Sequence, residues 1–185
     1  QLVIIGAGPA GLAAAREAAA LGLRVALVER HEIGGTCFNT GCVPSKALLR
    51  TAAVYAEMRD AARYGAEVPA DIRVDFSAVM ERLRRIRSHL TNTTSVRLLA
   101  ANGVDVYFGS AQFSGPDSLT VNDQPLRFDK ALIATGARPD IPDVPGLKQA
   151  GFLTNTTIFE LAELPPRLLV IGGGPLGCEL AQAFC

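Results

Sequence analysis

Three glycines with the spacing Gly-x-Gly-x-x-Gly stand near the start of the chain, directly after the short apolar run Leu2–Ile5. A continuous apolar run of this length is typical of a strand that is buried on both faces of a parallel sheet. Residues 12–21 are rich in alanine and predict a helix, and a second apolar run, residues 24–28, ends at Glu29. Strand, glycine turn, helix, strand and acidic residue are the parts of a dinucleotide-binding βαβ unit, in the required order.

The motif Gly6-x-Gly8-x-x-Gly11 is called the first fingerprint below, and each of its glycines is needed for a different physical reason. Gly6 permits the tight turn, Gly8 lets backbone N–H groups approach a pyrophosphate at the helix N-terminus, and Gly11 allows close packing of helix on strand. Glu29 can accept hydrogen bonds from a ribose. A purely structural glycine turn is the alternative, but the complete strand–helix–strand context favours a bound nucleotide.

The same fingerprint returns near the other end of the chain, at Gly172, Gly174 and Gly177. It lies between a predicted buried strand, residues 167–171, and the start of a predicted helix. These two fingerprints are the only internal repeat in the sequence. Two fingerprints predict two dinucleotide sites.

Proline and glycine are frequent in residues 139–146, which is the composition of a linker. We therefore expect a domain boundary nearby, with a first domain over residues 1–160 and the beginning of a second over residues 161–185. A strand and part of a helix cannot bury a core of their own, so we expect the chain to be part of a longer protein.

Between the fingerprints, the sequence predicts a helical excursion followed by a small antiparallel meander. Helices are expected at residues 45–58 and 76–101, with a loop at residues 65–71 between them. Alternating or apolar runs bounded by turn residues predict strands at Val104–Phe108, Ser118–Val121, residues 126–128 and, as a buried strand, residues 128–136. The predicted fold class is α/β: a Rossmann-like domain with this excursion and meander, and the start of a second Rossmann-like domain.

Cys37 and Cys42 lie five positions apart and could form a reversible disulfide. Five residues of regular helix would separate their Cα atoms too far, but Gly41 and Pro44 supply an irregular first turn. Lys46 follows Cys42 by one helical turn, so its ammonium could stabilise a thiolate or a reduced cofactor. Buried free thiols or half of a zinc site are alternatives, although zinc pairs usually lie about two to four residues apart and no second Cys/His pair follows.

These stretches together resemble the class I pyridine nucleotide-disulfide oxidoreductases, whose members include dihydrolipoamide dehydrogenase, glutathione reductase and mercuric reductase. The resemblance covers nearly all of the chain, and the two fingerprints, the cysteine loop and an Ala-Thr-Gly strand end occur in the family's order. It implies an FAD-binding first domain and an NAD(P)-binding second domain. Electrons would pass from NADPH or NADH to FAD, then to a Cys37–Cys42 disulfide, and on to a small thiol, disulfide or metal-ion substrate. A full-length protein of this family is expected to be a homodimer.

The resemblance also implies a role for particular residues. Cys42 matches the thiol that faces the flavin, Cys37 matches the outer thiol that exchanges with substrate, and Lys46 and Glu179 match an ion pair beside the flavin ring and the nicotinamide; these four are the predicted catalytic residues. Cys178 has no counterpart, and we expect it to pack as an apolar residue. No metal ligand is predicted. The predicted cofactor contacts are Gly6, Gly8, Gly11, Glu29, Gly35, Thr36, Lys46, Ala111, Thr135 and Gly136 for FAD, and Gly172, Gly174 and Gly177 for the nicotinamide cofactor.

Within the family, the triplet Pro44-Ser45-Lys46 is unlike the Pro-Lys-Lys of glutathione reductases. Val43 is more similar to mercuric reductases, since the lipoamide enzymes tend to have isoleucine there, and Thr40 departs from the valine common to both. A mercuric reductase-like function is therefore preferred, with dihydrolipoamide dehydrogenase as the alternative. A flavin reductase without a dithiol and a non-catalytic nucleotide or thiol-metal module are more distant; the cysteine loop disfavours the first and the single cysteine pair the second.

Composition excludes several other partners. The 18 basic and 18 acidic residues give a formal net charge of zero, so nothing favours nucleic acid or an acidic membrane surface. No apolar run is long enough to span a membrane, and the start of the chain lacks the charged leader of a signal peptide. We therefore expect a cytoplasmic location, where a cysteine pair is more often catalytic than structural.

Overall fold

The computed structural model describes residues 1–69 and 71–185. These residues form two compact units: the first unit contains residues 1–39 and 89–138, and the second contains residues 40–88 and 139–185. The predicted loop at residues 65–71 includes Ala70, which lies outside the described residues. The domain boundary after residue 160 remains a prediction. None of the described helices is long and apolar enough to cross a membrane.

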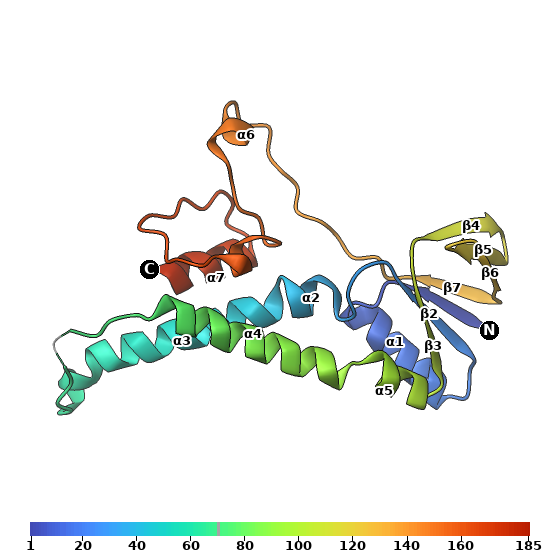
Figure 1. Cartoon of the computed structure of the whole chain (residues 1–185), viewed down its shortest axis with the longest axis horizontal. Coiled ribbons are helices and arrows are strands. Elements are labelled where there is room, and N and C mark those ends of the chain that lie inside the picture. The colour runs from blue at the N-terminus through green and yellow to red at the C-terminus, as the bar shows by residue number, and fades with distance from the viewer. Residues whose placement is uncertain (70) are drawn as a thin grey trace. The chain divides into compact units, whose positions relative to one another are not determined.

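A four-stranded parallel sheet is the centre of the first unit (Figure 1). Its order is β3-β2-β1-β7, and every neighbouring pair is parallel. Two strands, β1 and β3, have the predicted bounds. The four strands are β1 (Leu2–Ile5), β2 (Val25–Glu29), β3 (Val104–Phe108) and β7 (Lys130–Ile133). The predicted α/β class with a parallel sheet is confirmed.

Helices cover one face of this sheet and a three-stranded meander covers the other. Successive side chains of a strand point to opposite faces, so neighbouring residues of β1 pack against different layers. Ile4 packs with Leu12 and Ala15 of α1 (Pro9–Ala20) and with Leu99 of α5 (Val96–Ala101). Its neighbour Val3 packs on the opposite side with residues of the meander and the chain that leaves it: Leu119, Val121 and Phe128. The meander consists of the antiparallel strands β4 (Ala111–Gly115), β5 (Ser118–Val121) and β6 (Gln124–Arg127).

Two expectations for the first unit were wrong. β3 belongs to the parallel sheet, and the unpredicted β4 completes the meander in its place. The strand expected to be buried, β7, lies at the edge of the sheet, and all four of its residues are exposed. Its apolar sequence indicated a strand correctly but could not show how many neighbours that strand has.

The long helix expected at residues 76–101 is two helices, α4 (Phe76–Thr93) and α5. Thr94 directs its hydroxyl at the carbonyl oxygens of Leu90 and Thr91, at 3.1 and 3.3 Å. Ser95 then has an extended backbone, with φ −62° and ψ 153°, and caps α5. Hydroxyl side chains that bond to the local backbone compete with helix propagation, which explains the break.

Helices dominate the second unit. They are α3 (Cys42–Asp60), the short 3₁₀ helices η1 (Ala61–Tyr64) and η2 (Ile158–Glu160), most of α4, α6 (Leu147–Ala150) and α7 (Pro175–Phe184). Their core is a cluster of buried side chains from α3, α4, η2 and α7: Ala47, Leu48, Met80, Leu83, Ile158, Phe159 and Leu180. This core holds the N-terminal half of α3 against α7.

The strand predicted at residues 167–171 is not formed. These residues have no regular secondary structure, and Leu169 and Ile171 are 85% and 58% exposed. A strand is held by hydrogen bonds to a neighbouring strand, and no strand of the described chain pairs with this segment. The helix α7 that follows is nevertheless present, as the second fingerprint predicts.

Candidate functional site

A pocket of about 400 Å³ opens at the carboxyl ends of β1, β2 and β7 in the first unit. This is the edge of a parallel α/β sheet at which ligands bind. Five of the residues predicted to contact FAD lie together around the pocket: Gly6, Glu29, Ala111, Thr135 and Gly136. Arg30, Ser110 and Arg138 line the pocket as well and were missed, because nothing in their spacing marks them in the sequence.

Glu29 lines this pocket and is only 9% exposed. Its two carboxylate oxygens accept hydrogen bonds from the backbone N–H groups of Ala7 and His31, each at 2.8 Å. Its backbone carbonyl accepts a further one from Gly109, also at 2.8 Å. A carboxylate oxygen has two lone pairs, so each one can still accept a bond from a ribose hydroxyl.

The glycine turn leaves room for a phosphate group. Gly6 has a φ of +107°, and a Cβ on Gly11 would overlap the carbonyl oxygen of Gly6, so both positions need glycine. Gly8 caps α1, and a Cβ there would meet nothing within 4 Å. No side chain caps this helix end in the described part of the chain, so the first N–H groups of α1 have no side-chain partner there and could bind an anion. The turn and the fixed Glu29 therefore fit the pyrophosphate and ribose of FAD.

The loop that carries the two cysteines spans both compact units. Cys37 is half-buried in α2 (Gly35–Asn39) of the first unit, where Thr36 is exposed. Gly35 packs close to the first fingerprint, since a Cβ on it would lie 2.9 Å from the Cα of Gly8. Cys42 begins α3 in the second unit and carries a free, exposed thiol. The pairing of Cys37 with Cys42 remains a prediction.

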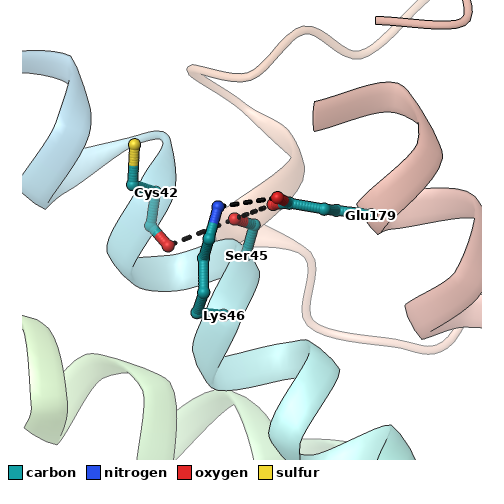
Figure 2. Close-up of polar contacts among 4 residues, drawn as sticks. All are labelled: Cys42, Ser45, Lys46 and Glu179. Atoms are coloured by element: carbon teal, nitrogen blue, oxygen red, sulfur yellow. Dashed lines mark hydrogen bonds and ion pairs between the residues drawn. The ribbon is translucent and has the colours of Figure 1, made fainter. Parts of the chain in front are cut away.

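Two predicted catalytic residues lie together in the second unit (Figure 2). Lys46 Nζ of α3 is 2.6 Å from Glu179 Oε1 of α7. The Ser45 hydroxyl donates a hydrogen bond to Glu179 Oε2 at 2.5 Å. The bonds from Lys46 and then Ser45 hold the pKa of the Glu179 carboxyl below its usual value, against a smaller opposing effect of burial. The helix that follows the cysteines thus contacts the helix that follows the second fingerprint.

The second fingerprint has the same turn as the first. Gly172 has a φ of +109°, and a Cβ on Gly177 would lie 2.6 Å from the carbonyl oxygen of Gly172. Gly174 caps α7, again with open space where a Cβ would be. The expectation for Cys178 was wrong: its side chain is exposed and its thiol donates to the carbonyl oxygen of Gly173 at 3.5 Å.

Known proteins of one family are similar to this chain. The sequence profile of the family described as "Pyridine nucleotide-disulphide oxidoreductase" matches residues 1–185. The mercuric reductase of Lysinibacillus sphaericus is 38% identical over 184 residues, which cover 100% of this chain and 34% of that protein. The dihydrolipoyl dehydrogenase of Acholeplasma laidlawii is 34% identical over 188 residues, covering 100% of this chain and 56% of that protein.

A solved structure is also similar. The HOCl-induced flavoprotein disulfide reductase RclA from Escherichia coli matches with a TM-score of 0.82 and 34% identity, over 100% of this chain and 39% of that one. The chain thus spans between a third and somewhat over half of the length of these proteins. It belongs to the pyridine nucleotide-disulphide oxidoreductases, a family of FAD-containing, NAD(P)H-dependent enzymes.

Proposed function

We propose that the full-length protein moves electrons between NAD(P)H, FAD and a Cys37–Cys42 disulfide, and from there to a small thiol, disulfide or metal-ion substrate. The observation that carries this proposal is the ion pair between Lys46 and Glu179. It joins the helix of the cysteine loop to the helix of the second fingerprint, the two elements that a path from nicotinamide to dithiol has to connect.

The pocket beside Glu29 is the proposed FAD site, and the turn before α7 is the proposed nicotinamide site. FAD supplies two-electron transfer between a nicotinamide and a disulfide. Glu29 would hold the ribose, the N-terminus of α1 would face the pyrophosphate, and Gly172, Gly174 and Gly177 would let a second pyrophosphate approach α7.

The two cysteines are the proposed redox-active disulfide of this chain. Reduction breaks the bond between the two sulfur atoms, consumes two electrons and two protons, and leaves two thiols. Resemblance assigns substrate exchange to Cys37 and the flavin side to Cys42, whereas Cys42 is the more exposed thiol in the structure.

Brief alkylation of the reduced, FAD-loaded protein tests which thiol exchanges with substrate. Earlier labelling of Cys37 supports the proposed assignment, and earlier labelling of Cys42 reverses it.

A mercuric reductase-like activity is the preferred substrate assignment, supported by Val43 and by the 38% identity to the mercuric reductase of L. sphaericus. Dihydrolipoyl dehydrogenase activity is the second candidate, because a protein of that name matches the whole chain at 34% identity. We expect the full-length protein to oxidise NADPH in the presence of Hg(II). Oxidation of dihydrolipoamide with NAD⁺, without a response to Hg(II), would establish the second candidate instead.

A further inference from the structure

Ser45 is a buried hydroxyl between the ion pair and the cysteine loop. It lies on α3, is 1% exposed, and has two acceptors within reach (Figure 2). Its Oγ is 2.5 Å from Glu179 Oε2 and 3.2 Å from the backbone carbonyl oxygen of Cys42. The sequence gives no sign of the contact between Ser45 and Glu179, because the two residues are 134 positions apart.

A serine hydroxyl has a single hydrogen, so it can donate fully to only one of these acceptors. A bond to an ionised carboxylate is about twice as strong as one to a neutral acceptor and is typically about 2.5–2.7 Å long. The hydrogen therefore points at Glu179 while that carboxylate is charged. The carbonyl of Cys42, three residues earlier on α3, is the second acceptor in the position that helical serines use for backbone bonding.

The charged group that faces Glu179 from α3 is Lys46, on the other carboxylate oxygen. Two arginines of α4 have other partners: Arg82 donates to the carbonyl oxygen of Ala47 and to Thr51 Oγ1, and Arg87 donates to Glu160. Ser45 and Lys46 thus hold one oxygen each of the same carboxylate. Both bonds lower the pKa of Glu179, with the larger effect from Lys46.

We propose that Ser45 is a positioning residue, which orients the Glu179 carboxylate for Lys46 and whose hydroxyl turns to the Cys42 carbonyl when Glu179 takes up a proton. The proton comes from solvent, and Ser45 keeps its own hydrogen throughout. Protonated Glu179 then donates to Ser45 Oγ, and Ser45 donates to the Cys42 carbonyl oxygen, so the direction of the hydrogen-bond chain reverses. The protonation state of Glu179 on α7 is in this way coupled to the backbone of Cys42, a proposed redox cysteine. A role of this coupling in catalysis rests on the function proposed above.

The direct test is a pH titration of Glu179 in the full-length protein. It is monitored by ¹³C NMR of protein with labelled glutamate carboxyl groups. Glu179→Gln identifies the resonance. We expect Ser45→Ala to move the titration midpoint to higher pH, because it removes a hydrogen bond that favours the charged form. Thr51→Ala is the matched control: it also removes a hydroxyl that is bonded to the α3 backbone, 3.1 Å from the Ala47 carbonyl oxygen. It should leave the midpoint in place, and an equal midpoint in wild type and Ser45→Ala would overturn the proposal.

A double-mutant cycle tests the same coupling between Ser45 and Glu179 through the rate of flavin reduction. Ser45→Ala should slow the reduction of bound FAD by NAD(P)H about tenfold, the loss expected when one charge-assisted hydrogen bond is removed. In a Glu179→Ala background the same change should have almost no effect, and equal slowing in both backgrounds would contradict a role through Glu179. A wild-type protein that NAD(P)H does not reduce would refute the proposed function, whereas the NMR titration would still decide the role of Ser45.

Discussion

Gly6 and Gly172 occupy equivalent positions in the two glycine fingerprints, and their φ angles are nearly equal, +107° and +109°. The strands before them differ. Val3 and Ile4 of β1 are 1% and 0% exposed and β1 is paired on both sides, whereas Leu169 is 85% exposed and its segment pairs with no strand among the described residues. The turn is therefore encoded by the local glycine spacing, while the strand before it forms only where neighbouring strands accept its hydrogen bonds.

The largest effect is expected from placing a valine at the middle glycine of each fingerprint. Gly8→Val should lower FAD affinity at least about 100-fold, because its side chain would fill the open space in front of α1. Folding stability should change by less than about 1 kcal/mol, since nothing lies within 4 Å of the new Cβ. FAD content after purification and thermal unfolding of the apoprotein measure the two quantities.

Gly174→Val is the matched variant in the second fingerprint, where a Cβ also has open space. It should leave FAD bound and the protein yellow, but should abolish reduction of that FAD by NAD(P)H. If Gly174→Val instead releases FAD while Gly8→Val retains it, the assignment of the two cofactors to the two fingerprints is reversed.

At the third glycine of each fingerprint, the expected effect is on folding stability and not on cofactor affinity. A methyl group on Gly11 would overlap the carbonyl oxygen of Gly6, whereas on Gly177 it would lie 2.6 Å from that of Gly172. Gly11→Ala should cost about 3 kcal/mol of folding free energy and Gly177→Ala about 1 kcal/mol, since the closer contact requires a larger separation of helix and turn. Denaturant unfolding of the two domains measures both, and a larger loss at Gly177 would contradict the ranking.

The parts that could be predicted from the sequence depend on short-range patterns. β1, β3 and β5 have the predicted bounds, and both fingerprint helices are present. The contact of Lys46 with Glu179 joins residues 133 positions apart, and only the resemblance to a family suggested it. The failures depend on tertiary neighbours. The strand predicted at residues 167–171 finds no pairing partner in the part of the chain that the structure describes, and β7 lies at an edge. The bond from Ser45 to Glu179 exists only once α3 and α7 are packed.

The smallest expected effect concerns the stability contributed by the ion pair. The pKa of Glu179 is lowered in the folded protein, so the Lys46–Glu179 contribution is fully present above the ordinary pKa of 4.5 and is lost as pH falls through the lower folded value. The Lys46 side chain is 59% exposed, which limits that contribution to less than about 1 kcal/mol. Unfolding of Lys46→Met and wild type should therefore differ at pH 7 and converge in acid, and a difference that grows in acid would contradict the sign.

The most direct test of the proposed electron path is a count of thiols in the full-length protein before and after anaerobic addition of one equivalent of NAD(P)H. Alkylation with isotopically distinct reagents and peptide mass spectrometry would locate every thiol that appears. Two new thiols per FAD are expected, at Cys37 and Cys42, with no change at Cys178 or Cys185. Bleaching of the flavin without new thiols at Cys37 and Cys42 would contradict the proposed path and favour a flavin reductase that uses no dithiol.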